Sequence, residues 1–82
     1  MHDRREAIAA HVVRLLRDER ERRQMSMTVL AQRAGLSQSM ISFVERDIRN
    51  PTLDTLLRIA EALELNLGEV IKRAYKLACR KS

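Results

Sequence analysis

Apolar side chains recur three or four positions apart along most of the chain, a spacing that places them on one side of a helix. Ile8, Val12, Leu15 and Leu16 form the first such stripe, and Arg and Glu residues fill the positions between them. Similar stripes follow further along the chain, separated by short stretches without the pattern. The pattern predicts one all-α domain over residues 1–82, with helices at about 4–23, 27–34, 38–46, 53–63 and 67–79.

The segment from residue 26 to residue 46 organises the rest of the chain. Ser26 and Ser37 are placed to cap two short helices with their hydroxyl groups. Gly35 supplies the left-handed backbone conformation that ends the first of these helices. Two helices that begin this close together cannot lie side by side in one direction, so we expect them to cross.

Apolar spacing assigns a buried side to the second of these helices. Ile41 and Val44 face the preceding helix, at about residues 27–34, where Ala31 is small enough to permit a close approach. The opposite side of the helix is left facing outward. It carries Gln38, Ser39, Ser42 and Phe43.

Charge narrows the function less than the pattern does. The 82 residues carry 16 Lys and Arg against 11 Asp and Glu, a net charge of +5. The basic excess lies in residues 1–24 and 66–82, whereas residues 35–50 sum to zero. A basic chain suits a polyanionic partner or merely a soluble surface, so the charge alone does not decide between them.

Several classes of site are not expected. Cys79 is the one cysteine, so an internal disulfide cannot form, and no apolar segment is long enough to span a bilayer. His2 and His11 lack further metal-ligating residues at suitable spacing, and the serines lack a His and an acid to activate them. We therefore expect a cytoplasmic protein that is not an enzyme and has no metal, cofactor or membrane association.

Small, glycine and aliphatic positions form a specific pattern through the central segment. They are Met25-Ser26, Leu30-Ala31, Ala34-Gly35-Leu36-Ser37, Ile41-Ser42, Glu45-Arg46, Arg49-Asn50-Pro51 and the segment LDTLLRIAEAL. This pattern closely resembles the helix-turn-helix domain of Xre-type regulators, the family of phage repressor and Cro proteins, over roughly residues 8–71. The resemblance implies a five-helix repressor-like DNA-binding domain in which residues 38–46 form the recognition helix.

The same resemblance implies a function. It indicates a transcriptional regulator that binds double-stranded DNA sequence-specifically as a homodimer. We therefore expect a palindromic operator with the two recognition helices in successive major grooves, about 34 Å apart. No second domain is expected to sense a ligand, so control would come from the protein's own concentration. Short members of the family include some antitoxins and the controller proteins of restriction-modification systems, which are the subtype we favour.

Four outward-facing residues are candidates for reading bases. Gln38 occupies the position from which similar phage repressors contact adenine, and an amide can pair with both edge groups of that base. Ser39 and Ser42 are short enough to bond a base edge or a phosphate. Phe43 stands where relatives often carry Arg or Gln. Its ring would be useful against a thymine methyl group, and the alternative is packing against the neighbouring loop or a partner subunit.

A second set of residues is expected at the DNA backbone. The N-termini capped by Ser26 and Ser37 present free N–H groups and the positive end of the helix dipole to phosphates. Relatives usually carry Gln where Met27 stands, so Met27 belongs to the set by its position in the family pattern, although it lacks the polar group of Gln. The predicted backbone set is Ser26, Met27, Ser37, Arg46, Arg49 and Asn50.

Departures from the family pattern change some local expectations. Gln24 stands where relatives usually place glycine, and they reach the next helix about three residues sooner, so we expect an extra helical turn or a longer loop near residues 21–24. Asp47 replaces another usual glycine and tolerates positive φ. Similar proteins tie the first helix to the end of the recognition helix. We expect Arg17 to pair with Glu45, the alternative being a solvated Arg17.

The last helix has a wide apolar stripe. Asn66 and Glu69 form a capping-box-like start. Part of the stripe must close the core, and the remainder predicts a homodimer interface; simple core closure is the alternative. The predicted interface consists of Leu67, Val70, Ile71, Ala74, Tyr75, Leu77 and Ala78.

Two rival functions stay open. One is an antitoxin or bridging module that keeps the fold and grips a protein partner, which the uncharged outward helix and Phe43 favour. The other is a nonspecific nucleic-acid binder driven by the basic termini.

Overall fold

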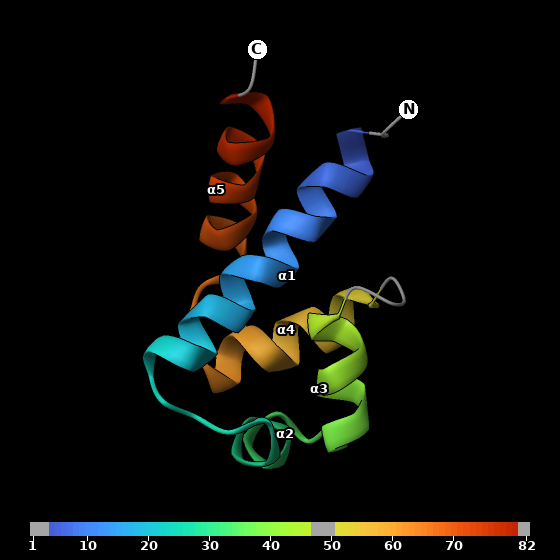
Figure 1. Cartoon of the computed structure of the whole chain (residues 1–82), viewed down its shortest axis with the longest axis vertical. Helices are drawn as coiled ribbons and strands as arrows, with labels where there is room; N and C mark the ends of the chain where they lie inside the picture. Colours follow the sequence, from blue (N-terminus) through green and yellow to red (C-terminus); the bar gives the residue numbers. More distant parts are fainter. Residues whose placement is uncertain (1–3, 47–50, 81–82) are drawn as a thin grey trace.

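The computed structural model describes residues 4–46 and 51–80, and within these residues it consists of helices joined by short turns (Figure 1). The fold is all-α, as predicted, and every helix boundary lies within one residue of the range expected from the sequence. The helices are α1 (Arg4–Arg22), α2 (Met27–Ala34), α3 (Gln38–Glu45), α4 (Leu53–Ala62) and α5 (Leu67–Arg80).

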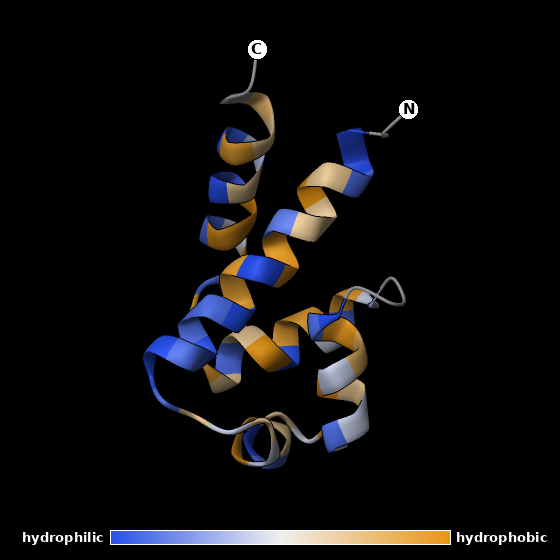
Figure 2. Ribbon diagram, in the orientation of Figure 1, coloured by the Kyte–Doolittle hydropathy of each residue, from blue (hydrophilic) through white to orange (hydrophobic). Residues whose placement is uncertain are grey.

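The helices enclose one aliphatic core. α1 packs most extensively against α5, α4 crosses near the middle of the molecule, and α2 and α3 lie at the end remote from the chain termini (Figure 1). Leu30, Ile41 and Leu63 are the largest fully buried side chains, and they come from three different segments. Hydrophilic residues of α5 gather on its side away from α1 (Figure 2), because its apolar stripe faces that helix.

The end of α2 is set by glycine. Gly35 has φ 70 and ψ 33, the left-handed conformation expected from the sequence. The N–H of Leu36 then donates to the carbonyl of Ala31 at 2.9 Å, which satisfies a carbonyl that the helix itself leaves without a partner. The chain turns at this point and starts α3.

Two further helix ends adopt the same geometry without glycine. After α1, Gln24 has φ 56, and the N–H of Met25 donates to the Arg20 carbonyl at 3.0 Å. After α4, Glu64 has φ 59, and the N–H of Leu65 donates to the Ala60 carbonyl in the same way. The expected lengthening near residues 21–24 takes the form of continued helix to Arg22, followed by a tight turn.

Some expectations concern segments that the structure does not describe. The positive φ predicted for Asp47 lies outside the described residues, as do the predicted phosphate contacts of Arg49 and Asn50. Over the described residues, no helix is long and apolar enough to cross a membrane.

Candidate nucleic-acid interface

α2 and α3 form a pair of short crossing helices. On α3, Ile41 and Val44 are buried against the rest of the domain, as the apolar spacing predicts. On α2, Leu30, Ala31 and Ala34 form the matching buried stripe. Burial of this one side fixes which residues of α3 face outward.

The outward side of α3 carries the predicted base-reading residues. Gln38 and Ser39 are exposed, Ser42 is half-buried, and the Phe43 side chain is 37% exposed. Met40, which we did not predict for this surface, is exposed to a similar extent at its flank. Each of these residues belongs to one eight-residue helix, so their spacing is fixed by helix geometry.

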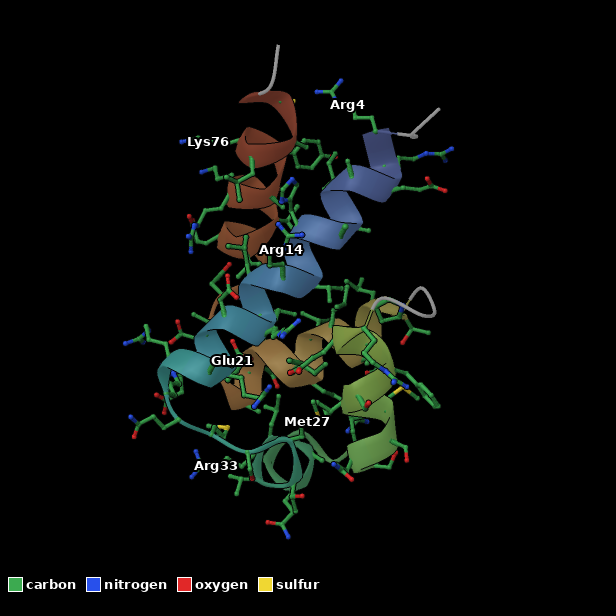
Figure 3. The ribbon with its side chains drawn as sticks, viewed as in Figure 1. Arg4, Arg14, Glu21, Met27, Arg33 and Lys76 are labelled. Atoms are coloured by element: carbon green, nitrogen blue, oxygen red, sulfur yellow. The ribbon has the colours of Figure 1, made fainter. Side chains whose placement is uncertain are left out.

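Both helices present capped N-termini. The N–H of Val29 donates to Ser26 Oγ at 3.1 Å, and the N–H of Met40 donates to Ser37 Oγ at 3.0 Å. The remaining first-turn N–H groups of each helix have no partner within the helix itself, which makes the two ends suitable for phosphate oxygens. Met27, the first residue of α2, is half-buried against the core (Figure 3).

A buried ion pair fixes the C-terminal end of α3. Arg20 of α1 donates from Nε to Glu45 Oε2 at 2.6 Å and from Nη2 to Oε1 at 3.0 Å. Its Nη1 also donates to the Met25 carbonyl at 2.7 Å, just before α2 begins. The Arg20 and Glu45 side chains are only 11% and 7% exposed. The hydrogen bonds to Glu45 raise the pKa of Arg20 above its ordinary value.

The prediction that Arg17 pairs with Glu45 is wrong. Arg17 Nε lies 3.4 Å from Glu21 Oε2, one turn further along α1, and both of these side chains are about half exposed. Arg20 continues the buried stripe of α1 that includes Leu16, whereas Arg17 lies on the solvent side. The signal for Arg20 was therefore in the sequence, as a charged residue on the inward stripe.

A second ion-pair cluster ties the end of α1 to the turn after α4. Glu19 Oε2 accepts from Arg22 Nη2 at 2.6 Å and from Arg23 Nε at 2.7 Å. Arg23 Nη1 also reaches Glu64 Oε1 at 3.3 Å. The hydrogen bonds from the two arginines lower the pKa of Glu19 to about 2. This cluster supports the connection that leads into α2.

Cations surround the C-terminal end of α3. Arg14 and Arg17 of α1 and Arg46 line a small hollow of about 140 Å³ together with Glu45. Arg46 is exposed and caps α3. Of the predicted backbone residues past α3, Arg46 is the one that lies among the residues that the structure describes.

The structure divides the predicted dimer surface of α5. Leu67, Val70 and Ala74 are buried in the core of the same chain, so their side chains close the domain and are not available to a second copy. Tyr75 is 49% exposed, and the rest of the predicted set is half-buried. The apolar surface that remains on α5 is Ile71, Tyr75, Leu77 and Ala78.

This remaining surface borders an open groove. The groove, of about 270 Å³, lies between the first half of α1 and α5, where Ile8, Ala9, Ile71 and Tyr75 contribute to its lining. On α4, Leu53 and Leu57 are also well exposed. We did not predict them, although their separation of four residues on the helix is a visible signal of a second apolar edge.

The described residues contain no group of three or more metal-ligating side chains close enough to hold a metal ion. Cys79 is exposed and has a free thiol that accepts a hydrogen bond from Arg4 Nη2 at 2.9 Å. Arg4 extends from the start of α1 toward the end of α5 (Figure 3). This contact joins the two ends of the α1 and α5 pair.

Known proteins share the central part of this chain. A family model described as helix-turn-helix matches residues 16–70. The HTH-type transcriptional regulator Rv0474 of Mycobacterium tuberculosis is 41% identical over 59 residues, which are 72% of this chain and 42% of that protein. The regulator y4dL of Sinorhizobium fredii is 42% identical over 57 residues, or 70% of this chain and 29% of that protein.

A phage protein and a solved structure extend the comparison. The immunity repressor protein of Bacillus phage phi105 is 36% identical over 52 residues, covering 63% of this chain and 36% of the repressor. The chain thus spans less than half the length of these curated relatives. The crystal structure of a point mutant of the restriction-modification controller protein C.Esp1396I matches with a TM-score of 0.80, 24% identity, and coverage of 92% of this chain and 97% of that one. This likeness establishes a shared fold.

Proposed function

The chain belongs to the helix-turn-helix family, and on that premise we propose that it is a sequence-specific, double-stranded DNA-binding transcriptional regulator. It acts as a homodimer on a palindromic operator, with α3 in the major groove. The observation that carries this proposal is the one-sided burial of α3. Ile41 and Val44 anchor one side, and the other side presents polar and aromatic side chains at the tip of a rigid helix pair.

The polar contacts follow from this placement. Gln38 lies one residue after the Ser37 cap and pairs with the N6 and N7 groups of an adenine. Phosphates bind the N-termini of α2 and α3 at Ser26 and Ser37, and Arg46 binds the strand beyond α3. Ser39 and Ser42 have short side chains, and their hydroxyl groups form hydrogen bonds to a base edge or a phosphate. Arg49 and Asn50 belong to the proposed backbone set by their position in the sequence.

The Arg20–Glu45 ion pair supports a positioning role. It holds the end of α3 against α1, and the same guanidinium holds the Met25 carbonyl at the start of α2. The two DNA-facing helices are therefore oriented by one buried side chain. Such preorganisation lowers the entropy cost of binding because the interface does not have to become ordered on contact.

The homodimer uses the apolar surface left on α5, namely Ile71, Tyr75, Leu77 and Ala78. A two-fold axis through this surface sets two α3 helices about 34 Å apart, one turn of DNA. Among family subtypes we favour a restriction-modification controller, because the fold matches such a protein over nearly the whole of both chains. Control then comes from protein concentration, through dimerisation coupled to DNA binding.

Selection of random duplex DNA by the purified protein at moderate salt tests this function. Sequencing of the retained DNA is expected to give a two-fold symmetric motif with half-sites about one helical turn apart. Retention without any motif would contradict sequence-specific regulation and favour nonspecific binding through the basic termini. That mode is recognised by a steep loss of affinity with salt.

A second candidate function is an antitoxin or bridging module that binds a protein partner. It is favoured by the absence of Lys and Arg in α3 and by the exposed apolar side chains of Phe43 and Met40. Failure to retain any DNA in the selection would favour this function. Binding to a protein through aliphatic and aromatic surface would persist at high salt, whereas binding to phosphates would not.

A further inference from the structure

We propose that α3 reads the C5-methyl groups of thymine in its DNA site, and that Phe43 is the side chain that reads them. This inference rests on the proposed function and specifies the chemistry of its recognition surface. It makes the central base pairs of each half-site A·T rather than G·C.

The side chains of α3 provide none of the strong contacts by which G·C pairs are read. Guanine is usually read by a bidentate Arg or Lys, and the segment Gln38–Glu45 contains neither. Cytosine is read by a carboxylate that accepts from its N4 group. Glu45 is the one carboxylate of α3, and both of its oxygens already accept hydrogen bonds from Arg20. What remains is one amide, two hydroxyl groups and apolar surface.

Phe43 is placed to supply the apolar contact. It lies one helical turn after Ser39 on the side of α3 opposite the buried Ile41, and more than a third of its side chain is exposed. Ser39 is small, so a base edge can approach beside the ring. In the major groove the thymine methyl is the one apolar group that a base pair offers, which makes it the matching contact.

The size of the effect follows from the buried area. Covering one methyl group with apolar surface contributes about 0.8 kcal/mol, which corresponds to roughly four-fold in affinity. Gln38 adds recognition of adenine, which again selects an A·T pair. The expected motif is therefore rich in A·T under α3.

The test replaces single thymines by deoxyuridine, which lacks only the C5-methyl group. The motif from the random-duplex selection supplies the starting site. Each half-site is expected to contain one thymine whose replacement lowers the affinity of the unmodified protein roughly four-fold. Placing 5-methylcytosine instead of cytosine at that position is expected to gain a similar factor, because the methyl occupies the same place in the groove.

Two variants assign the effect to a side chain. Phe43→Ala is expected to bind thymine and deoxyuridine sites equally, and Phe43→Leu to retain part of the difference. Met40→Ala is the matched control, since Met40 is equally exposed but lies at the flank of α3. It is expected to retain the full four-fold difference.

The outcomes separate this inference from the function on which it rests. A motif without sensitivity to deoxyuridine at any position would overturn methyl reading and leave the regulator intact. The same holds if Phe43→Ala keeps the sensitivity or Met40→Ala loses it. Recovery of no motif would instead contradict the proposed function. The deoxyuridine scan on the unmodified protein tests methyl reading even if Phe43→Ala folds poorly, and the more conservative Phe43→Leu then tests the role of the ring.

Discussion

Removal of the Arg20 side chain tests whether one buried ion pair orients the DNA-facing helices. The variant Arg20→Ala eliminates both hydrogen bonds to Glu45 and the hydrogen bond to the Met25 carbonyl. Arg17→Ala is its matched control. It removes the same residue type, one turn earlier on the same helix, from an exposed pair with Glu21.

The magnitude is set by what each substitution leaves behind. Arg20→Ala leaves a carboxylate whose side chain is only 7% exposed without its cation. Breaking a buried pair in this way costs about 3–5 kcal/mol, and partial access to water places this case near the lower end. Arg17→Ala removes an exposed pair between neighbouring turns, which contributes less than about 0.5 kcal/mol.

Thermal and urea unfolding followed by far-ultraviolet circular dichroism measure the difference. For a domain of this size, about 3 kcal/mol lowers the melting temperature by roughly 12–24 °C, whereas the control should shift it by no more than about 4 °C. The double variant Arg20→Met, Glu45→Met is expected to recover much of the loss, because apolar residues of similar volume do not require a buried counter-charge.

Equal costs for Arg20→Ala and Arg17→Ala would refute the reasoning, as would a cost below about 1 kcal/mol for Arg20→Ala. In either case the ion pair would not hold α3 in place. Recovery of stability without recovery of DNA affinity in the double variant would be consistent with an ion pair that holds α3 in place. The polar pair would then be needed for the angle of α3 rather than for stability alone.

Three further predictions concern separate parts of the molecule. Gln38→Ala is expected to cost roughly 1–3 kcal/mol on the selected site and to relax preference at one base pair, which binding to a panel of single-base variants measures. Glu19→Gln is expected to lower the melting temperature near neutral pH. Because the folded pKa of Glu19 is about 2 against an ordinary 4.5, its contribution is present above about pH 4.5 and disappears as the pH falls to about 2. If Glu19→Gln is equally destabilised near neutral pH and near pH 2, the ionised Glu19 carboxylate does not contribute to stability. Tyr75→Glu, at an exposed position, is expected to give a folded monomer by sedimentation; a folded dimer would show that the α5 surface is not the interface.

Local signals predicted the helices well. Ser26, Ser37 and Gly35 act within three or four residues of their own positions, so the sequence contains all that is needed to place the ends of α2 and the start of α3. The outward side of α3 follows in the same way, because Ile41 and Val44 mark the opposite side. These features required no knowledge of distant segments.

Contacts between distant segments were predicted less well. Arg17 and Arg20 are both arginines near the end of α1, and the choice between them depends on how α1 is rotated against α3. The stripe on α5 shows a similar limit. Its apolar residues can be recognised from sequence, but the share buried by α1 depends on the crossing of the two helices, which local pattern does not encode.

The left-handed residues Gln24 and Glu64 leave the domain some room for engineering. A side chain in this conformation costs about 1–2 kcal/mol relative to glycine, although glycine also makes the unfolded chain more flexible, so the net gain from exchange is a few tenths to about 1 kcal/mol. Glu64 receives a hydrogen bond from Arg23, which glycine would remove. Gln24→Gly is therefore the better substitution for raising the thermal stability of the domain, and it would leave the α3 surface unchanged.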